Sequence, residues 1–331
     1  MVSELKKNML LKQTLGHFCV DASCATIVIG STRDIFPALW FYVLYNFYAF
    51  CLQPFAGIVL DKFKKVQPKH YIISSFFLLL LGFIPYFNLW ARILLIGIGN
   101  CLFHLGAGTV ILTSAGKKMA PLGIFVSSGA VGLVVGSWLA FYPVWQSIFI
   151  FALMMLILLN FDVPQKITVK SAKIRWGLAW ALCLCIAIRA CMGFVSLTEF
   201  KKSPLIVLII TLGVFTGKSL GGILCDKWGI KKVVLFSTAF VMALFLFSFQ
   251  NPYLWTIVQI IVNLSMPITL YLMYKSMPSC PAFSFGLAAS FLTIGFLLAV
   301  WLEKFSLPPA YFLALFAINS VIILYSQKSL K

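Results

Sequence analysis

Apolar runs of about 20 residues, the length that one membrane-spanning helix needs, follow one another along the whole chain. They predict helices near 13–31, 36–58, 70–87, 90–114, 121–141, 144–161, 176–198, 203–225, 232–250, 253–275, 282–302 and 308–326. The longest polar connection, Asp162 to Arg175, falls at the midpoint. We therefore expect an all-α membrane protein with twelve transmembrane helices in two six-helix bundles, 1–162 and 176–331, joined by a cytoplasmic linker at 163–175.

The composition supports a membrane protein. Hydrophobic residues make up 62% of the chain and charged residues 10%, whereas soluble domains are about 45–50% apolar. With a cytoplasmic N-terminus, 19 lysines and arginines fall in inside segments and 5 in outside segments. This bias follows the positive-inside rule, and it accounts for the net charge of +18 without a nucleic-acid partner. We expect a multi-pass protein of the cytoplasmic (inner or plasma) membrane, with both termini in the cytoplasm.

The nine cysteines lie within or at the ends of apolar runs and include no C-x-x-C pair. This distribution is typical of small residues that pack between helices and not of a disulfide framework or a zinc site. The cysteines therefore indicate no zinc site, and we expect neither a bound metal nor a cofactor.

One short motif occurs twice, each time where an apolar run meets a basic turn. Gly-Ile-Val-Leu-Asp-Lys recurs 165 positions later as Gly-Ile-Leu-Cys-Asp-Lys. The main residues of the two copies are Gly57, Asp61 and Lys62, and Gly222, Asp226 and Lys227. The spacing of half a chain length indicates two related halves.

The aspartate of each copy should end a helix, where its charge opposes the helix dipole. A carboxylate there needs the N-terminus of another helix or a cation nearby. We expect Asp61 to face residues 281–285 and Asp226 to face residues 120–123, as contacts that gate the protein. A basic turn that contains an aspartate by chance is the alternative for a single copy.

Polar side chains also occur inside the predicted spans, where they are costly and mark substrate or ion pathways. Three pairs are spaced four residues apart and so share a helix face, and a single arginine lies in another span. The candidates for substrate binding and coupling are His17, Asp21, Asn100, His104, Arg189, Gln259 and Asn263.

Each candidate has a structural alternative. A single membrane histidine or amide often makes only an interhelical hydrogen bond worth about 0.6 kcal/mol. The charged Asp21 and Arg189 are harder to explain in that way, because a lone charge at mid-bilayer costs at least ~2.5–3.5 kcal/mol. Lys218 lies nearer the inner surface and can extend its amine toward water.

A third glycine pattern lies in the predicted helix 121–141. Gly129, Gly132 and Gly136 form a face of small residues that allows another backbone to approach closely. Close packing and a role in gating are both compatible with this face.

The repeated motif resembles the loop motif that follows the second and eighth helices of the major facilitator superfamily. The segment 16–21 (Gly-His-Phe-Cys-Val-Asp) resembles the first-helix signature of the fosmidomycin-resistance branch, and the segment 97–104 resembles its fourth-helix signature. The chain departs from that branch at Leu105-Gly106, where Pro and Glu usually follow the histidine. Arg92 also lies five residues before Gly97, where the superfamily has four.

This resemblance implies two parallel repeats with the substrate handled near the midplane. It implies a monomeric secondary active transporter that moves a small molecule through the lipid bilayer by alternating access. We expect protons as the coupling ion, because Asp21 and the histidines can change protonation and an unperturbed histidine titrates near pH 6.5. Efflux by a drug-resistance antiporter comes from the branch resemblance alone, and the fifth helix lacks the Gly-Pro step of the export motif.

Other functions stay open. Arg189 would attract an anionic or phosphonate-like group, so uptake or exchange of a small organic anion is one alternative. The short chain leaves a non-transporting membrane scaffold as another. An intramembrane enzyme could use His17, Asp21 and His104 as acid–base groups, but the absence of a nucleophile motif and of a soluble domain leads us to expect no enzyme.

Overall fold

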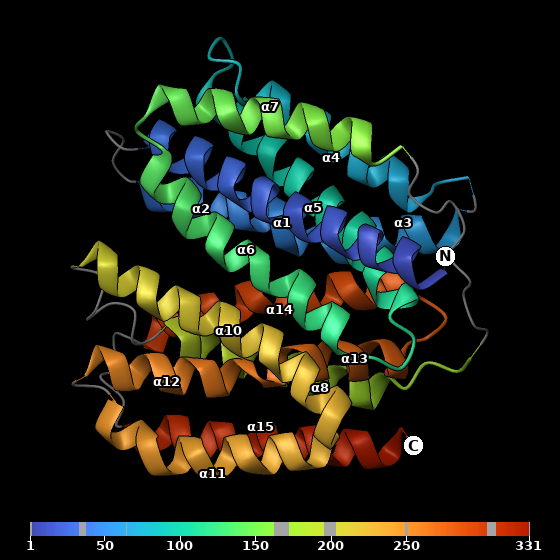
Figure 1. Ribbon diagram of the computed structural model, residues 1–331, viewed down its shortest axis with the longest axis vertical. Helices are drawn as coiled ribbons and strands as arrows, with labels where there is room; N and C mark the ends of the chain where they lie inside the picture. The colour runs from blue at the N-terminus through green and yellow to red at the C-terminus, as the bar shows by residue number, and fades with distance from the viewer. Residues whose placement is uncertain are drawn as a thin grey trace. The chain divides into compact units, whose positions relative to one another are not determined.

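The computed structural model describes residues 2–32, 38–63, 65–161, 172–194, 203–248, 251–302 and 309–330. These residues form helices and short connections (Figure 1). The first half contains α1 (Val2–Thr32), α2 (Ala38–Asn46), the π-helix η1 (Phe47–Cys51), α3 (Gln53–Lys62), α4 (Pro68–Gly82), α5 (Leu89–Ser114), α6 (Ala120–Leu139) and α7 (Pro143–Leu159). The second half contains α8 (Trp176–Phe194), α10 (Pro204–Trp228), α11 (Ile230–Ser248), α12 (Pro252–Asn263), α13 (Ser265–Ser276), α14 (Pro281–Leu302) and α15 (Pro309–Ser329).

Nine helices in the described part of the chain are long and apolar enough to cross a membrane. Two of these spans are composite, because α2, η1 and α3 form one and α12 and α13 form another. The other three predicted spans correspond to α4, α7 and α11, which have 15, 17 and 19 residues. The all-α fold is confirmed, whereas twelve membrane crossings stay a prediction.

Two predicted helices differ from the structure at prolines. The span expected at 70–87 ends at Gly82, because Pro85 follows and Asn88 already caps α5 through its side chain, which accepts from the Ala91 amide at 2.9 Å. The span expected at 253–275 breaks at Leu264. Pro267 has no N–H to donate to the carbonyl of Asn263, four residues earlier, so the regular helix cannot continue through this point.

The span that includes η1 is irregular for a related reason. Pro54 lies one residue into α3 and interrupts the regular bonding of the preceding turn. The buried side chain of Gln53 donates to the carbonyl of Ala49 at 2.8 Å and so binds one of the carbonyls inside η1. Single π-turns of this kind are frequent at functional sites.

The chain divides into two compact units. Unit 1 consists of residues 1–116, 128–169 and 280–290, and unit 2 consists of residues 117–127, 170–279 and 291–331. The start of α6 thus belongs to unit 2, and the start of α14 belongs to unit 1. The predicted linker falls mostly outside the described residues, and the predicted domain boundaries stay a prediction.

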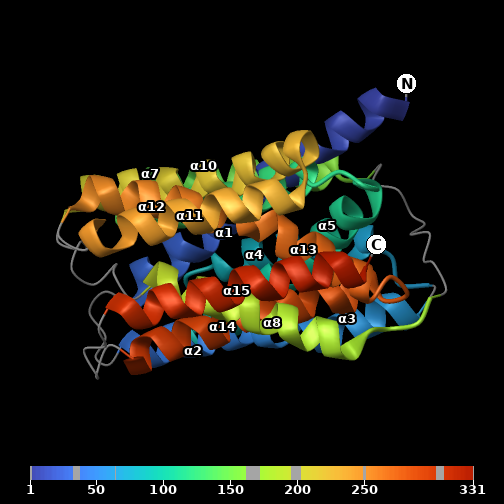
Figure 2. The same cartoon turned by 90° about the horizontal axis from the view of Figure 1, so that it is seen from below.

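Each unit is a bundle with its own helix contacts. In unit 1, α5 packs against α1 and α4, and α7 packs against α1 and α4. In unit 2, α11 lies along α12 and α15 (Figure 1), and α15 lies along α8 (Figure 2). Glycines allow the closest approach here, because Gly217 and Gly221 of α10 stand against the backbone carbonyls of Ile260 and Leu264.

The small-residue face of α6 packs directly on α1. A Cβ at Gly132 would collide with the backbone of Phe18, and one at Gly136 would collide with the backbone of Ala22. Thr26 donates its hydroxyl to the carbonyl of Gly136 at 3.0 Å across the same contact. Close packing, one of the two roles expected for this face, is therefore confirmed.

This contact predicts that Gly136→Ala destabilises unit 1. The added methyl group must displace the α1 backbone, and overpacking of this kind costs about 1–3 kcal/mol. Gly177→Ala in α8 is the matched control, because a Cβ there meets nothing within 4 Å. The measurement is the thermal unfolding midpoint of the purified protein in detergent, and equal midpoints for the two variants would contradict the packing argument.

Candidate substrate and coupling site

The polar residues predicted on the first and fourth spans meet inside unit 1. His17 and Asp21 lie one turn apart on α1, and Asn100 and His104 lie one turn apart on α5. α1 and α5 pack together, so the two polar faces meet. All four side chains are buried, with exposed fractions of 0–6%. We call these four residues the α1–α5 cluster.

Asp21 lies at the centre of the α1–α5 cluster. Its Oδ1 accepts a hydrogen bond from the Asn100 amide at 2.9 Å and lies 3.8 Å from His104 Nε2. Its Oδ2 lies 3.3 Å from His17 Nε2. A carboxylate buried among apolar helices requires such partners, and α5 supplies two of the three.

The two histidines are held in defined orientations. His104 Nδ1 lies 3.0 Å from the backbone carbonyl of Asn100, which can only accept, so this nitrogen carries a proton. The Nε2 atoms of His17 and His104 lie 2.8 Å apart, which leaves room for a single proton between them. Phe103 and Phe50 pack against the imidazole of His104. The site therefore combines two opposed imidazole nitrogens, a carboxylate and an aromatic wall.

Two members of this network were missed at the sequence level. Asn100 also donates to the hydroxyl of Tyr45 at 3.0 Å, and its amide lies 3.7 Å from Cys24 Sγ. Tyr45 belongs to α2, just before η1, and Cys24 belongs to α1. Both are buried. Tyrosine and cysteine are common in apolar helices, so no local pattern distinguishes these two from packing residues.

Three donors of the α1–α5 cluster have the composition of a metal site. His17, Asp21 and His104 each offer one ligand atom, and these atoms lie within 4.8 Å of one another. From the sequence we expected no metal site. Two of the donors share one helix, and the third lies 83 positions further along the chain. Packing of α1 on α5 brings them together.

The predicted arginine lies in unit 2. Arg189 of α8 is 4% exposed, and its Nη1 donates to the hydroxyl of Thr269 on α13 at 2.9 Å. Its Nη2 has no hydrogen-bond partner among the described residues. Asp226 is the only carboxylate side chain in the described part of unit 2, and it accepts from the Met119 amide. Arg189 therefore has no ion-pair partner within that part. Pairing with Asp21 stays a prediction.

Gln259 and Asn263 end α12 at the helix break. The Asn263 amide donates to the backbone carbonyl of Gln259 at 2.8 Å and lies 3.4 Å from Gln259 Oε1. Gln259 Nε2 has no partner among the described residues. Gln259 Oε1 lies 3.8 Å from the position of a Cβ on Gly193, one turn beyond Arg189 on α8. Unit 2 thus holds two buried N–H donors that a ligand oxygen could occupy.

The two motif aspartates make the contacts predicted for them. Asp61 accepts from the backbone amides of Ala282 and Phe283 at 3.0 and 2.8 Å. These amides lie in the first turn of α14 and have no partner within the helix.

Asp226 repeats this geometry in unit 2. It accepts from the amides of Met119 and Ala120 at 2.7 and 3.0 Å, where α6 begins. The N-terminus of a helix favours negative charge, so each carboxylate that ends one helix is stabilised by the start of another.

The motif glycines allow these contacts. A Cβ at Gly57 would lie 2.8 Å from the backbone of Ala282 and Phe283. A Cβ at Gly222 would collide with the backbone of Met119 and Ala120. The side chains of Lys62 and Lys227 are exposed and form the basic end of each turn.

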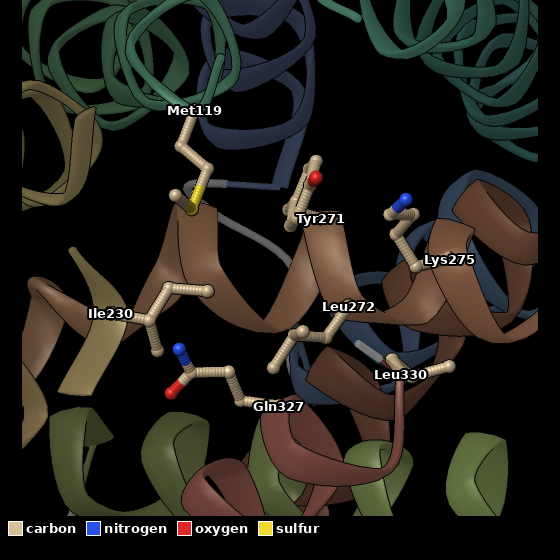
Figure 3. A pocket seen from close by; sticks show the side chains of 7 residues that line it. All are labelled: Met119, Ile230, Tyr271, Leu272, Lys275, Gln327 and Leu330. Atoms are coloured by element: carbon tan, nitrogen blue, oxygen red, sulfur yellow. The ribbon is translucent and has the colours of Figure 1, made fainter. Parts of the chain in front are cut away.

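A pocket of about 340 Å³ lies in unit 2 (Figure 3). It is lined by Met119, Ile230, Tyr271, Leu272, Lys275, Gln327 and Leu330. The amine of Lys275 lies 5.9 Å from the centre of the Tyr271 ring. No predicted site residue lines this pocket, so it carries no part of the candidate site.

Comparison with known proteins bears on the fold. No protein-family model matches the chain, and no curated protein matches it. A single-residue variant of the E. coli fucose:proton symporter FucP is 15% identical, with a TM-score of 0.73, over 96% of this chain and 97% of that chain. FucP in the outward conformation, described as a Major Facilitator Superfamily transporter, is 14% identical with a TM-score of 0.70 over the same shares.

A bacterial homologue of the iron transporter ferroportin, in an outward-facing state, is 13% identical with a TM-score of 0.64 over 98% of both chains. The resemblance to the fosmidomycin-resistance branch stays a prediction. At these identities the likeness concerns the fold. Together with the apolar spans, it shows that the chain is a multi-pass membrane protein with the fold of the major facilitator superfamily transporters.

Proposed function

We propose that this protein is a secondary active transporter that moves a small molecule across the cytoplasmic membrane by alternating access, with protons as the coupling ion. The observation that carries the proposal is the α1–α5 cluster, in which Asp21, His17 and His104 are buried within apolar helices. Ionisable groups in this setting are costly and belong to substrate or ion pathways. The solved transporters of similar fold support the transport function.

The proposed direction is efflux by antiport, in a monomer with both termini in the cytoplasm. Its support is the resemblance of residues 16–21 and 97–104 to the fosmidomycin-resistance branch. A site that binds either a proton or the substrate, but not both, exchanges one for the other. The shared position between His17 Nε2 and His104 Nε2, 2.8 Å apart, is compatible with such exclusive occupancy.

Exchange or uptake of a small organic anion is the second candidate function. The observation that favours it is Arg189, which is buried and has one unpaired N–H group in the described part of the chain. An anion that accepts from Arg189 and from Gln259 Nε2 would satisfy both donors. Arginine is suited to this role because its planar fork binds a carboxylate or phosphate through two parallel hydrogen bonds.

The proposed gate consists of the two motif contacts. Asp61 at the start of α14 and Asp226 at the start of α6 each use two backbone amides. We propose that these contacts form and break during each transport cycle. Hydrogen bonds between an exposed or half-buried carboxylate and helix N–H groups suit a reversible contact, because water can replace them at small cost.

The coupling role predicts that Asp21→Asn abolishes proton-driven accumulation while substrate binding persists. Asparagine keeps most of the side-chain shape but removes the negative charge. The measurement is substrate accumulation in proteoliposomes under a pH difference, with binding in detergent as the test of folding. An Asp21→Asn protein that still concentrates substrate against its gradient would place the coupling site elsewhere.

The anion candidate predicts that Arg189→Lys weakens binding of anionic substrates by about tenfold or more, because an ammonium cannot replace a bidentate fork.

A second prediction concerns the charge of Arg189. If Asp21 balances that charge, the double variant Arg189→Ala, Asp21→Ala should unfold at a higher temperature than Arg189→Ala alone, because the single variant leaves the charge of Asp21 buried and uncompensated. Unfolding and affinity are measured for both single variants and the double variant. Additive effects in both measurements would leave Arg189 a packing role with Thr269.

The gate predicts state-dependent crosslinking. Cysteines introduced by Asp61→Cys and Phe283→Cys should crosslink in one transport state and much less in the other, because the contact opens during the cycle. The two single-cysteine variants measure the background from native cysteines. Equal crosslinking with and without a saturating substrate and pH gradient would show that the contact is permanent.

A further inference from the structure

We propose that the α1–α5 cluster binds a divalent first-row transition-metal ion, which is the cargo of the transporter. The inference rests on the proposed transport function and names its substrate class. The ligands are His17 Nε2, His104 Nε2 and the carboxylate of Asp21. The three ligands, Asn100 and Gly129 all belong to unit 1.

The donor atoms are spaced as metal ligands are. The two Nε2 atoms are 2.8 Å apart, and the carboxylate oxygens lie 3.3 Å from His17 Nε2 and 3.8 Å from His104 Nε2. Ligands bound tetrahedrally at about 2.0–2.1 Å lie about 3.3–3.4 Å from one another. The three separations bracket this value, so an ion can bind after side-chain shifts of a few tenths of an ångström.

The orientation of His104 is that of a metal ligand. Its Nδ1–H donates to the backbone carbonyl of Asn100 at 3.0 Å, which directs the lone pair of Nε2 toward Asp21 and His17. Histidines that bind metals nearly always donate their other ring N–H to a carbonyl or carboxylate in this way. The carbonyl that holds the imidazole lies one turn back on the same helix.

Asp21 is likewise held by an outer partner. The Asn100 amide donates to its Oδ1 at 2.9 Å. Asn100 is fully buried, and its own Oδ1 has no hydrogen-bond partner among the described residues. This oxygen is an orphaned acceptor on the side chain that holds Asp21, so the α1–α5 cluster contains an unsatisfied buried polar atom beside its three donors.

The ligand set selects the class of ion. Two imidazoles and one carboxylate suit zinc, iron, cobalt, nickel and copper, whereas calcium and magnesium prefer oxygen ligands only. Structural zinc sites are usually closed by four protein ligands, and sites with three keep a position open. The α1–α5 cluster offers three protein ligands, so a bound ion keeps a position for water or another ligand and is not enclosed as in a structural site.

Gly129 limits the room around the α1–α5 cluster. A Cβ at this position would collide with Asp21 Oδ2 and His17 Nε2. The backbone of α6 thus covers two of the three donors, and only glycine leaves them undisturbed. Gly129→Ala should perturb metal binding although it removes no ligand.

The first test is binding of Co²⁺ to the purified full-length protein in detergent, with Zn²⁺ as competitor. Protein-bound Co²⁺ should show visible absorption bands that differ from those of the hydrated ion, and Zn²⁺ should abolish them. His17→Ala and His104→Ala should each weaken binding by more than about tenfold, since even loss of an outer partner costs 10–100-fold. His70→Ala is the matched control, because His70 is the remaining histidine of the chain and is exposed.

A second measurement needs no variant of the α1–α5 cluster. The X-ray absorption spectrum of the Zn²⁺-loaded His70→Ala protein should show scattering from two imidazoles. Ligation by oxygen alone, or Co²⁺ binding that His17→Ala and His104→Ala leave unchanged, would overturn the site.

The cargo role is tested by Zn²⁺ entry into proteoliposomes that enclose a zinc-sensitive dye. Zn²⁺ entry that requires His17 and His104 supports the cargo role. Binding of Zn²⁺ to the α1–α5 cluster without any entry overturns that role. Proton-driven accumulation of another substrate, with no metal bound at the α1–α5 cluster, would overturn this inference while the proposed transport function stood. Failure of all transport with metal bound would reject the function and keep the site.

Discussion

A carboxylate inside a membrane helix has no water to solvate it, and this constraint organises unit 1. Asp21 obtains its partners from its own helix and from α5, namely His17, His104 and Asn100. The partners are effective only while α1 and α5 stay packed at one depth and one rotation. The polar network therefore depends on apolar packing, and a shift of either helix would leave a buried charge without compensation.

Glycine determines how closely the surrounding helices approach. α6 rests on α1 through Gly132 and Gly136, and Gly129 extends the same face to the α1–α5 cluster. In unit 2, Gly217 and Gly221 bring α10 against the carbonyls at the end of α12. Backbones that touch in this way gain dispersion contacts and lose little side-chain entropy. The ionisable groups are thus enclosed by rigid contacts, which is what a precise binding site requires.

Interrupted helices occur beside the polar residues of both units. The π-turn of η1 precedes α3 and brings Phe50 against His104, and the break at Leu264 follows Gln259 and Asn263. Irregular backbone at membrane depth is tolerated where it is buried in protein or lines a cavity. In transporters such breaks expose carbonyls and amides to substrate or ions. Pro54 and Pro267 explain why the regular bonding fails at these points.

The sequence by itself determined the all-α membrane architecture, the pairing of polar residues four apart on single helix faces, and the contacts of Asp61 and Asp226. These features follow from local periodicity and from the chemistry of helix ends, both of which are written in short stretches of sequence. The helix breaks at Pro85 and Pro267 also follow from local chemistry. They were missed because the spans were assigned from the length of the apolar runs alone.

The tertiary structure decided which polar faces meet. His17 and His104 are 87 positions apart, and Asn100 reaches Tyr45 across 55. Such meetings depend on the rotation and depth of each helix, which are set by the summed packing of many apolar side chains and by glycine contacts. Because the sequence does not specify helix rotation and depth, the grouping of the three metal donors could be recognised only in the tertiary structure. The same holds for the orphaned oxygen of Asn100 beside them.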